Sequence, residues 1–421
     1  MHDLDTALVG ATAADQMTLR RSNLSLVLRA LRDGGPRSRA RLAADLGLNK
    51  ATVSSLVLEL GDRRLVREGG IERGGIGRPG QSVEVDGQSV CGIGAEINVH
   101  HVATLALDLT GEQVSEHRLS LDTLRMDTGE VLDHLADLIA RTFDDVAARG
   151  ARPVAVTVGI AGLVDAGRAV LALGPNLDWH DVPVASMLRE RLGGPPYPIL
   201  IDNEANLAAM AEAVPTDPAR QDMLVLFGEV GVGGGIIADG RLLRGNRGYA
   251  GEFGHMIVDP QGRRCGCGRT GCWETVIGLR ALLDAAADPD DPIRDPALGL
   301  EDRLNELNRR AGLGDSRTIA ALERVGDWVG VGAGLLANVL NPGVIVLSGY
   351  FAEVGDWMLA TISARLEEAV LAPRAGGTRV ELSNLGFTAA VRGAAGAALE
   401  TVFTDPTRVE RRVESTTGGT R

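Results

Sequence analysis

The chain has 421 residues, 44% of them hydrophobic, and a formal net charge of −13. This length allows two or three domains, and no apolar run is long enough to cross a membrane or is arranged like a signal peptide. We therefore expect a cytoplasmic protein with no membrane partner. Three of the four cysteines lie in one short loop, which fits a reducing compartment.

Positive charge is concentrated near the N-terminus. Residues 18–80 contain 13 Lys+Arg against 6 Asp+Glu, a net charge of +7, and taking this from the total of −13 leaves −20 for the rest of the chain. The acidic total alone would argue against nucleic acid as a partner. A basic segment attached to an acidic body is, however, the asymmetry expected when a DNA-binding module is joined to a second domain.

The basic segment has the pattern of three short helices. Residues 1–17 are weakly patterned and are expected to be mobile or to form a short helix. Ser38 and Asn49 are suited to be N-caps, and Gly47 supplies a turn between the last two helices, as in a helix-turn-helix. Apolar spacing and these caps predict helices at 24–31, 39–46 and 50–64.

Two short strands, 65–68 and 81–85, follow and flank a glycine-rich stretch that contains Gly77-Arg78-Pro79. We therefore predict a winged helix-turn-helix domain over residues 1–85. The third helix would enter the major groove with short donors and one cation, and the wing arginine would enter a minor groove. The alternative is a protein-interaction module with surface arginines. The candidate DNA contacts are Arg39, Lys50, Thr52, Ser54, Ser55 and Arg78.

Beyond Asp86 the pattern changes to a β-β-β-α-β unit over 91–160, which recurs between 224 and 383. A duplicated unit implies an α/β body of two lobes around a cleft. The stretch 279–316 is expected to be a solvated insertion. We predict a first lobe from 86–203 plus 388–403, a second lobe from 204–387, and a disordered tail at 404–421, which lacks apolar spacing.

One loop of the second lobe carries a metal-ligand pattern. His255, Cys265, Cys267 and Cys272 are the ligand types of a closed structural Zn²⁺ site, three thiolates and one imidazole. A Cys-x-Cys pair bridges poorly and three thiols leave one over, which argues against the alternative of a disulfide. Carboxylates at both ends of a metal-fixed loop would suit the hydroxyls of a sugar.

The pattern Glu252-x-Gly-His255, followed by Gly-x-x-Cys-x-Cys-Gly-x-x-Gly-Cys-x-Glu up to Glu274, resembles the signature of the ROK family, which unites sugar-responsive bacterial repressors and sugar kinases. The resemblance extends from about residue 19 to about residue 402 and includes Gly77-Arg78-Pro79. It implies an actin/hexokinase-like, two-lobed body behind a winged helix-turn-helix head.

The sugar side of the cleft is similar to that of the family. The stretch 201–206 matches the one that carries the catalytic Asp of the kinases, but Glu204 stands at that position. Its extra methylene shifts the carboxylate by about 1 Å, which can cost on the order of 100-fold in rate. The alternative is that Asn203 and Glu204 only cap the next helix. The residues expected to bind sugar are Asn176, Asn203, Glu204, Glu252, His255 and Glu274.

The nucleotide side departs from the kinases. The stretch 96–101 stands where they carry Asp-x-Gly-Gly-Thr and has neither Gly nor Thr, and Val230 stands where they carry a Thr. The glycines at 231–235 are kept, although they are also what a tight hairpin needs. Gly332-Ala333-Gly334, expected near a helix start, is only weakly similar to the adenosine-side loop.

We therefore predict a regulator, with no catalytic residues, that represses genes of sugar uptake or catabolism. Its partners would be operator DNA and a small neutral sugar, and it would act as a homodimer or a dimer of dimers. The stretch 202–206 is similar to that of xylose repressors, which favours a pentose or an unmodified hexose. The alternatives are a ROK-type ATP-dependent sugar kinase with an appended head, and a ligand-insensitive repressor governed by a partner protein.

Overall fold

The structure, a computed structural model, describes residues 3–71, 81–213, 217–295, 298–371 and 377–411, with the side chains of 3–15 and Ile71 left aside. Arg78 of the predicted wing and the last ten residues of the predicted tail therefore lie outside the described residues. Within those ranges, no helix is both long and apolar enough to cross a membrane.

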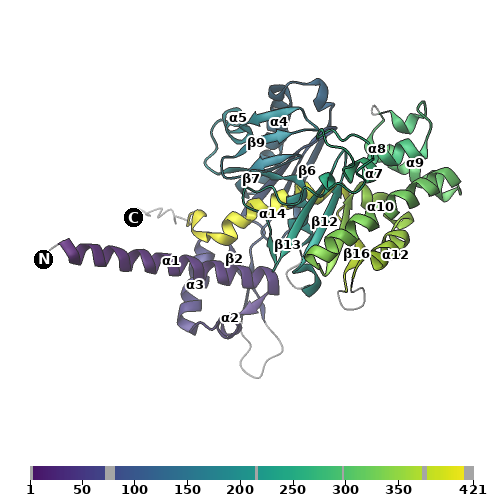
Figure 1. The fold of residues 1–421 in the computed structure, drawn as a ribbon. Helices are drawn as coiled ribbons and strands as arrows, with labels where there is room; N and C mark the ends of the chain where they lie inside the picture. Colours follow the sequence, from purple (N-terminus) through teal and green to yellow (C-terminus); the bar gives the residue numbers. More distant parts are fainter. Residues whose placement is uncertain (1–2, 72–80, 214–216, 296–297, 372–376, 412–421) are drawn as a thin grey trace.

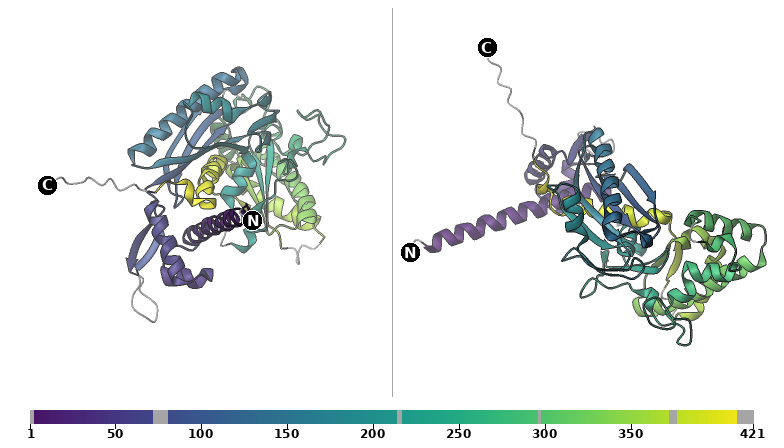
Figure 2. Two further views of the ribbon diagram at one scale, coloured as in Figure 1. Left: turned by 90° about the vertical axis from the view of Figure 1, so that its left-hand side faces the viewer. Right: turned by 90° about the horizontal axis from the view of Figure 1, so that it is seen from above.

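The N-terminal part, which we call the head, consists of three helices and a small sheet. The helices are α1 (Asp3–Gly34), α2 (Arg39–Leu46) and α3 (Lys50–Asp62). The Ser38 hydroxyl accepts from the Arg41 amide and the Asn49 side chain accepts from the Thr52 amide, so both predicted N-caps are confirmed. The first helix was predicted too short, because its N-terminal half has no apolar stripe to reveal it. Figure 2 shows that half projecting away from the body.

The head sheet has the order β1-β3-β2 and is antiparallel throughout. Its hairpin consists of β2 (Val66–Ile71) and β3 (Gln81–Val85), as predicted, whereas the short β1 (Arg37–Ser38) was not foreseen. The apolar faces of helices and hairpin meet in one cluster that includes Leu28, Leu56 and Val83.

Two five-stranded sheets of identical topology form the body. The first has the order β11-β7-β4-β5-β6 and the second, read in reverse, β16-β15-β12-β13-β14, so each has its first strand in the middle. The first comprises β4 (Val90–Ile97), β5 (His101–Asp108), β6 (Gln113–Ser120), β7 (Arg152–Ile160) and β11 (Ile199–Asn203). The second comprises β12 (Met223–Gly228), β13 (Val232–Ala238), β14 (Arg241–Leu242), β15 (Val344–Gly349) and β16 (Arg379–Leu382). This repeat confirms the predicted duplication.

Two helices lie between these sheets, α6 (Glu204–Glu212) and α14 (Ala389–Thr404) (Figure 1). A Cβ on Gly94 of β4 would stand 2.1 Å from the Val391 carbonyl oxygen, and one on Gly393 would stand 1.8 Å from the Leu207 carbonyl oxygen. Glycine is therefore required where α14 packs on the first sheet and on α6. The last helix packs on the first lobe, as predicted.

The outer faces are covered by further helices. The first sheet is covered by α4 (Thr128–Ala148) and α5 (Val184–Arg191), and a small antiparallel sheet follows β7, with strands β8 (Leu163–Asp165), β9 (Val170–Gly174) and β10 (Trp179–Val182). The second sheet is covered by α7 (Glu274–Ile277), α8 (Leu279–Ala286), α9 (Leu300–Gly312), α10 (Ser316–Leu340), α11 (Tyr350–Val354) and α12 (Leu359–Ala369). Leu304 and Leu307 of α9 are buried in this layer, so the expectation of a solvated insertion is wrong.

The segment after α14 is also ordered up to Arg411. Val409 is buried among head residues, and the Arg63 guanidinium donates to the carbonyl oxygens of Thr407 and Val409. The predicted disordered tail is therefore wrong for residues 404–411, because their contacts are backbone hydrogen bonds and one apolar anchor that apolar spacing does not reveal.

Candidate functional site

A cavity of about 790 Å³ opens between the lobes. The small sheet and the end of β11 line one side, while the turn before β13 and the loop 249–274 line the other. All six predicted sugar-binding residues line this cavity, so the fold brings together positions separated by up to 98 residues in sequence. Their role in sugar binding remains a prediction.

The cavity also has polar lining residues that sequence reasoning missed. His180 lies on β10, and Tyr249 precedes the metal-ligand loop. Neither belongs to a spaced motif, so only the fold could reveal them. Asp178, two residues after Asn176 in the sequence, also lines the cavity, and its positive φ of 57° marks a tight turn.

Asn203 and Glu204 have different tasks. The Asn203 side-chain oxygen accepts from the amides of Ala205 and Asn206 at 2.9 and 3.2 Å, and its nitrogen donates to the Gly162 carbonyl at 2.9 Å. Asn203 is thus the N-cap of α6, which agrees with the alternative that this residue caps the helix. Glu204 makes no such cap. Its Oε2 is buried without a hydrogen-bond partner among the described residues. Burial, followed by the charges of Glu96 and Glu252, raises its pKa to about 8.

The predicted metal ligands lie together beside the cavity. One ligand atom from each of His255, Cys265, Cys267 and Cys272 lies within 4.8 Å of the others. The Cys267 and Cys272 sulfurs are 3.6 Å apart, and the Cys265 sulfur is 3.7 Å from His255 Nδ1. Ligands about 2.3 Å from a tetrahedral ion lie about 3.8 Å from one another, so the set fits Zn²⁺. All four cysteines of the chain are free thiols, and the alternative of a disulfide is wrong.

His255 and Glu274 link the sulfur cluster to the cavity. While His255 Nδ1 faces the sulfurs, its Nε2 lies 3.9 Å from a Glu252 carboxylate oxygen. One oxygen of Glu274 accepts from the Cys265 thiol at 3.5 Å and the other from the Val232 amide at 3.0 Å. A metal held by the sulfurs would therefore fix the orientation of groups that line the cavity.

The glycine-rich turn is explained by close packing on both faces of β13. A Cβ on Gly234 would stand 2.2 Å from the Phe253 ring, and one on Gly235 would stand 2.4 Å from the Ala209 methyl. These glycines let α6 and the loop 249–255 approach the strand, which agrees with the alternative that they serve the backbone and not a phosphate.

Gly332 and Gly334 lie in the interior of α10, not near its start. A Cβ on Gly332 would stand 2.1 Å from the indole of Trp273, which is fully buried next to Cys272. The expectation that this stretch lies near a helix start is therefore wrong, and Gly332 accommodates a side chain of the metal loop.

The predicted DNA contacts on the head differ in exposure. Lys50 and Ser55 are exposed at the start of α3, whereas Thr52 and Ser54 are half-buried. The Ser55 hydroxyl accepts from Arg20 at 3.2 Å, and Arg39 donates to Glu68 at 2.7 Å. No described partner in the protein engages the Lys50 ammonium.

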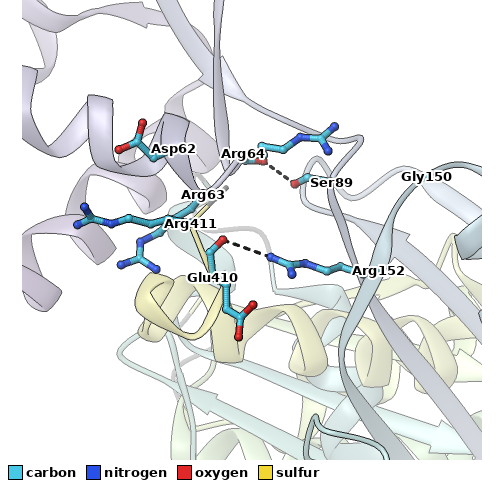
Figure 3. Close-up of a pocket in the computed structure, with 8 residues that line it drawn as sticks. All are labelled: Asp62, Arg63, Arg64, Ser89, Gly150, Arg152, Glu410 and Arg411. Atoms are coloured by element: carbon cyan, nitrogen blue, oxygen red, sulfur yellow. Dashed lines mark hydrogen bonds between the residues drawn. The ribbon is translucent and has the colours of Figure 1, made fainter. Parts of the chain in front are cut away.

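A second cavity of about 490 Å³ lies where the head, the first lobe and the C-terminal segment meet. Figure 3 shows four arginines around it, with Arg152 donating to the Glu410 carbonyl at 3.4 Å and Ser89 donating to the Arg64 carbonyl. These arginines are Arg63, Arg64, Arg152 and Arg411. The C-terminal segment thus connects the head to the body.

Comparison with known proteins shows the family to which this chain belongs. Residues 92–401 match the model of the ROK family, and the chain therefore belongs to that family and has its actin/hexokinase-like fold. The xylose repressor of Bacillus spizizenii is 28% identical over 389 residues, 92% of this chain and 97% of the repressor.

Two solved structures resemble the chain. A ROK family transcriptional regulator, a homologue of the E. coli MLC protein, has a TM-score of 0.76 at 22% identity and covers 93% of this chain and 99% of its own, which shows the fold. A ROK family glucokinase from Streptomyces griseus, in complex with glucose and AMPPNP, has a TM-score of 0.62 at 28% identity and covers 74% of this chain and 99% of its own.

Proposed function

We propose that this chain is a sugar-responsive transcriptional repressor. The head would be a winged helix-turn-helix that binds operator DNA, and a small neutral sugar would bind in the interlobe cavity. The observation that carries the proposal is the likeness to a xylose repressor over 92% of the chain, because a match of that length includes most of the head as well as the body.

The lining of the cavity supports a neutral polyol as ligand. Asn176, Glu252 and Glu274 offer amide and carboxylate groups in fixed directions, which suit vicinal hydroxyls. Four carboxyl groups line the cavity, those of Asp178, Glu204, Glu252 and Glu274, and the ionised ones would repel a sugar phosphate. A structural Zn²⁺ at the sulfur cluster would hold the loop that carries two of them.

Closure of the lobes on a sugar would reach the head through the junction described above. Arg29 and Arg32 of α1 both pair with Glu400 of α14, and Ser25 donates to the Phe403 carbonyl at 2.6 Å. A rotation of α14 with the first lobe would therefore move the head. A dimer would then change the spacing of its two heads.

A homodimer belongs to the proposal because helix-turn-helix repressors bind paired half-sites. An apolar patch on the body is available for it. Val339 and Leu371 are 78% and 94% exposed, and Leu335 and Leu340 lie beside them on α10. If the patch is the interface, Val339→Asp should give a monomer in size-exclusion chromatography with light scattering.

The alternative of an ATP-dependent sugar kinase is kept because a glucokinase with glucose and AMPPNP shares the fold. Against it, Glu204 stands where the kinases carry their catalytic Asp, and the stretch 96–101 has bulky side chains where the kinases have a glycine loop. We therefore propose a regulator without kinase activity.

The decisive experiment measures fluorescence anisotropy of the zinc-loaded protein on DNA from the promoters next to its own gene, with and without common neutral sugars. We expect specific binding that one sugar weakens. Lys50→Ala should weaken binding and lower the salt slope by about one, whereas Arg365→Ala on α12 should not. ATP-dependent phosphorylation of that sugar would overturn the proposal, and DNA binding that no sugar alters would favour control by a partner protein.

A further inference from the structure

The floor of the interlobe cleft contains three glutamates that face one another, which we call the carboxylate cluster: Glu96, Glu204 and Glu229. One oxygen from each lies within 4.8 Å of the others. They come from three separate elements. Glu96 is near the end of β4, Glu204 begins α6, and Glu229 follows β12. The cluster is distinct from the sulfur cluster, because it contains only oxygen ligands.

These carboxylates are buried with few hydrogen bonds. Glu96 is 1% exposed and Glu229 3%. Both oxygens of Glu96, Oε1 of Glu229 and Oε2 of Glu204 have no hydrogen-bond partner among the described residues. Asn98 Nδ2 donates to Glu229 Oε2, and the same amide also lowers the pKa of the neighbouring Glu96. Buried polar groups are normally paired, so four unpaired oxygens in one place indicate a missing partner.

Among the residues that the structure describes, no neighbouring base neutralises the cluster. His101 Nε2 is 3.7 Å from Glu96, but burial, followed by the charges of Arg118 and His100, lowers the His101 pKa to about 3, so its imidazole is neutral. Arg118 acts on the cluster only through space, while its guanidinium donates to Glu301 at 2.8 Å. Even a single buried, unpaired carboxylate costs several kcal/mol, so three require protons or a cation.

We propose that the carboxylate cluster binds one hard divalent cation of the size of Mn²⁺ or Ca²⁺, with Glu96, Glu204 and Glu229 as its protein ligands. Oxygen ligands are the ones such ions prefer. At metal–oxygen distances of 2.3–2.6 Å, ligand oxygens on opposite sides of an ion lie up to about 5 Å apart. The three oxygens lie within 4.8 Å of one another, which is inside this limit.

The position of the carboxylate cluster indicates what such an ion would do. It would join β4 and α6 on one side to the turn after β12 on the other, and so connect the two sheets. It would also orient Glu204, which lines the sugar cavity as well. We therefore expect the ion to change sugar affinity. This inference does not rest on DNA binding, and its test below is independent of any sugar.

The test uses Mn²⁺ as the probe and electron paramagnetic resonance of free Mn²⁺ as the readout, on the full chain loaded with one Zn²⁺. We expect one Mn²⁺ bound per chain and displaced by Ca²⁺. The double variant Glu96→Gln/Glu229→Gln should lose at least ten-fold in Mn²⁺ affinity. Neither of these residues lines the sugar cavity. Glu116→Gln, which removes an exposed carboxylate on β6, is the control and should bind as the unchanged protein does.

Thermal melting of the same proteins shows whether the variants fold. Glutamine has the shape of glutamate and removes repulsion, so the double variant should fold. Mn²⁺ should raise the melting temperature of the unchanged protein and of the Glu116→Gln control, but not that of the double variant. Absence of bound Mn²⁺ in the unchanged protein would overturn the proposal and leave a cluster neutralised by protons. Equal binding by the double variant would also overturn it, because the ion would then lie elsewhere. A sugar-dependent melting shift measured in parallel tests the proposed function separately.

Discussion

The head–body junction and the cleft floor both bury glutamates, but they surround them differently. At the junction, Glu59 accepts from Arg20 at 2.6 Å, Arg63 at 2.9 Å and Arg411 at 2.7 Å. At the cleft floor, Glu96 and Glu229 face other carboxylates instead. The same residue type is therefore stabilised by the protein in one region and left without a counter-charge in the other.

This difference affects the pKa values in opposite directions. At Glu59, burial would raise the pKa, but the hydrogen bonds from Arg63, Arg411 and Arg20 together lower it to about 2. At Glu96, burial outweighs the charge of Arg118 and a hydrogen bond from Asn98, and raises the pKa to about 7. A buried carboxylate that is paired with groups of opposite charge stabilises the fold. Buried carboxylates that face one another require protons or a bound cation.

The largest predicted effect concerns the cleft, because we expect the order of its loop 252–274 to depend on bound zinc. Cys272→Ser should remove the bound zinc, release the loop 252–274 and abolish the melting shift caused by sugar, because structural zinc contributes several kcal/mol. Hydrogen exchange of that loop and zinc content measure this. The backbone amides of the head should keep their protection from exchange, because the charged side chains at the head–body junction are paired within the protein and need no ion.

Cys91→Ala is the matched control, because Cys91 is buried in β4 away from the sulfur cluster and should leave the zinc content unchanged. If Cys272→Ser retained full zinc and sugar response, the role given to the sulfur cluster would be wrong.

At the junction, Glu59→Gln should destabilise the protein by about 2–3 kcal/mol at pH 7, because three arginines lose their shared acceptor charge. Urea unfolding followed by circular dichroism measures the free energy of unfolding. Glu68→Gln is the control, since the Glu68 carboxylate is 49% exposed in its pair with Arg39 and should matter by less than about 1 kcal/mol. Equal effects of the two changes would show that the junction is not built on Glu59.

The pH dependence sharpens this prediction. The folded-state pKa of Glu59, about 2, lies below its ordinary 4.5, so its contribution is complete above pH 4.5 and is lost as the pH falls towards 2. Urea unfolding between pH 5 and pH 3 should therefore show a steeper loss of stability for the unchanged protein than for Glu59→Gln. Parallel curves would contradict the assignment.

How far the sequence predicts these regions depends on distance along the chain. The caps Ser38 and Asn49 act on amides three residues away, and the sulfur ligands lie within one loop, so local chemistry predicts them. The duplicated strand order is predictable for the same reason, because each repeat has its own apolar spacing.

The carboxylate cluster was not predictable in this way. Glu96 and Glu229 are 133 positions apart and meet only because the two sheets face each other across α6 and α14. Glu96 was noted for the glycine loop it replaces and not for its neighbours. The contacts of residues 404–411 were missed likewise, since a segment bound by its carbonyl groups has no side-chain pattern.

The smallest predicted effect has the opposite sign to that at the junction. In buffer free of divalent cations, Glu96→Gln should stabilise the protein at pH 7 by about 1–2 kcal/mol, because it removes a buried charge that faces Glu204 and Glu229. Urea unfolding in the presence of a chelator too weak to take the zinc measures this. Adding Mn²⁺ should then stabilise the unchanged protein and cancel the advantage of the variant. A glutamine that destabilises the protein under both conditions would mean that Glu96 has a partner of opposite charge after all, and the contrast between the two regions would fail.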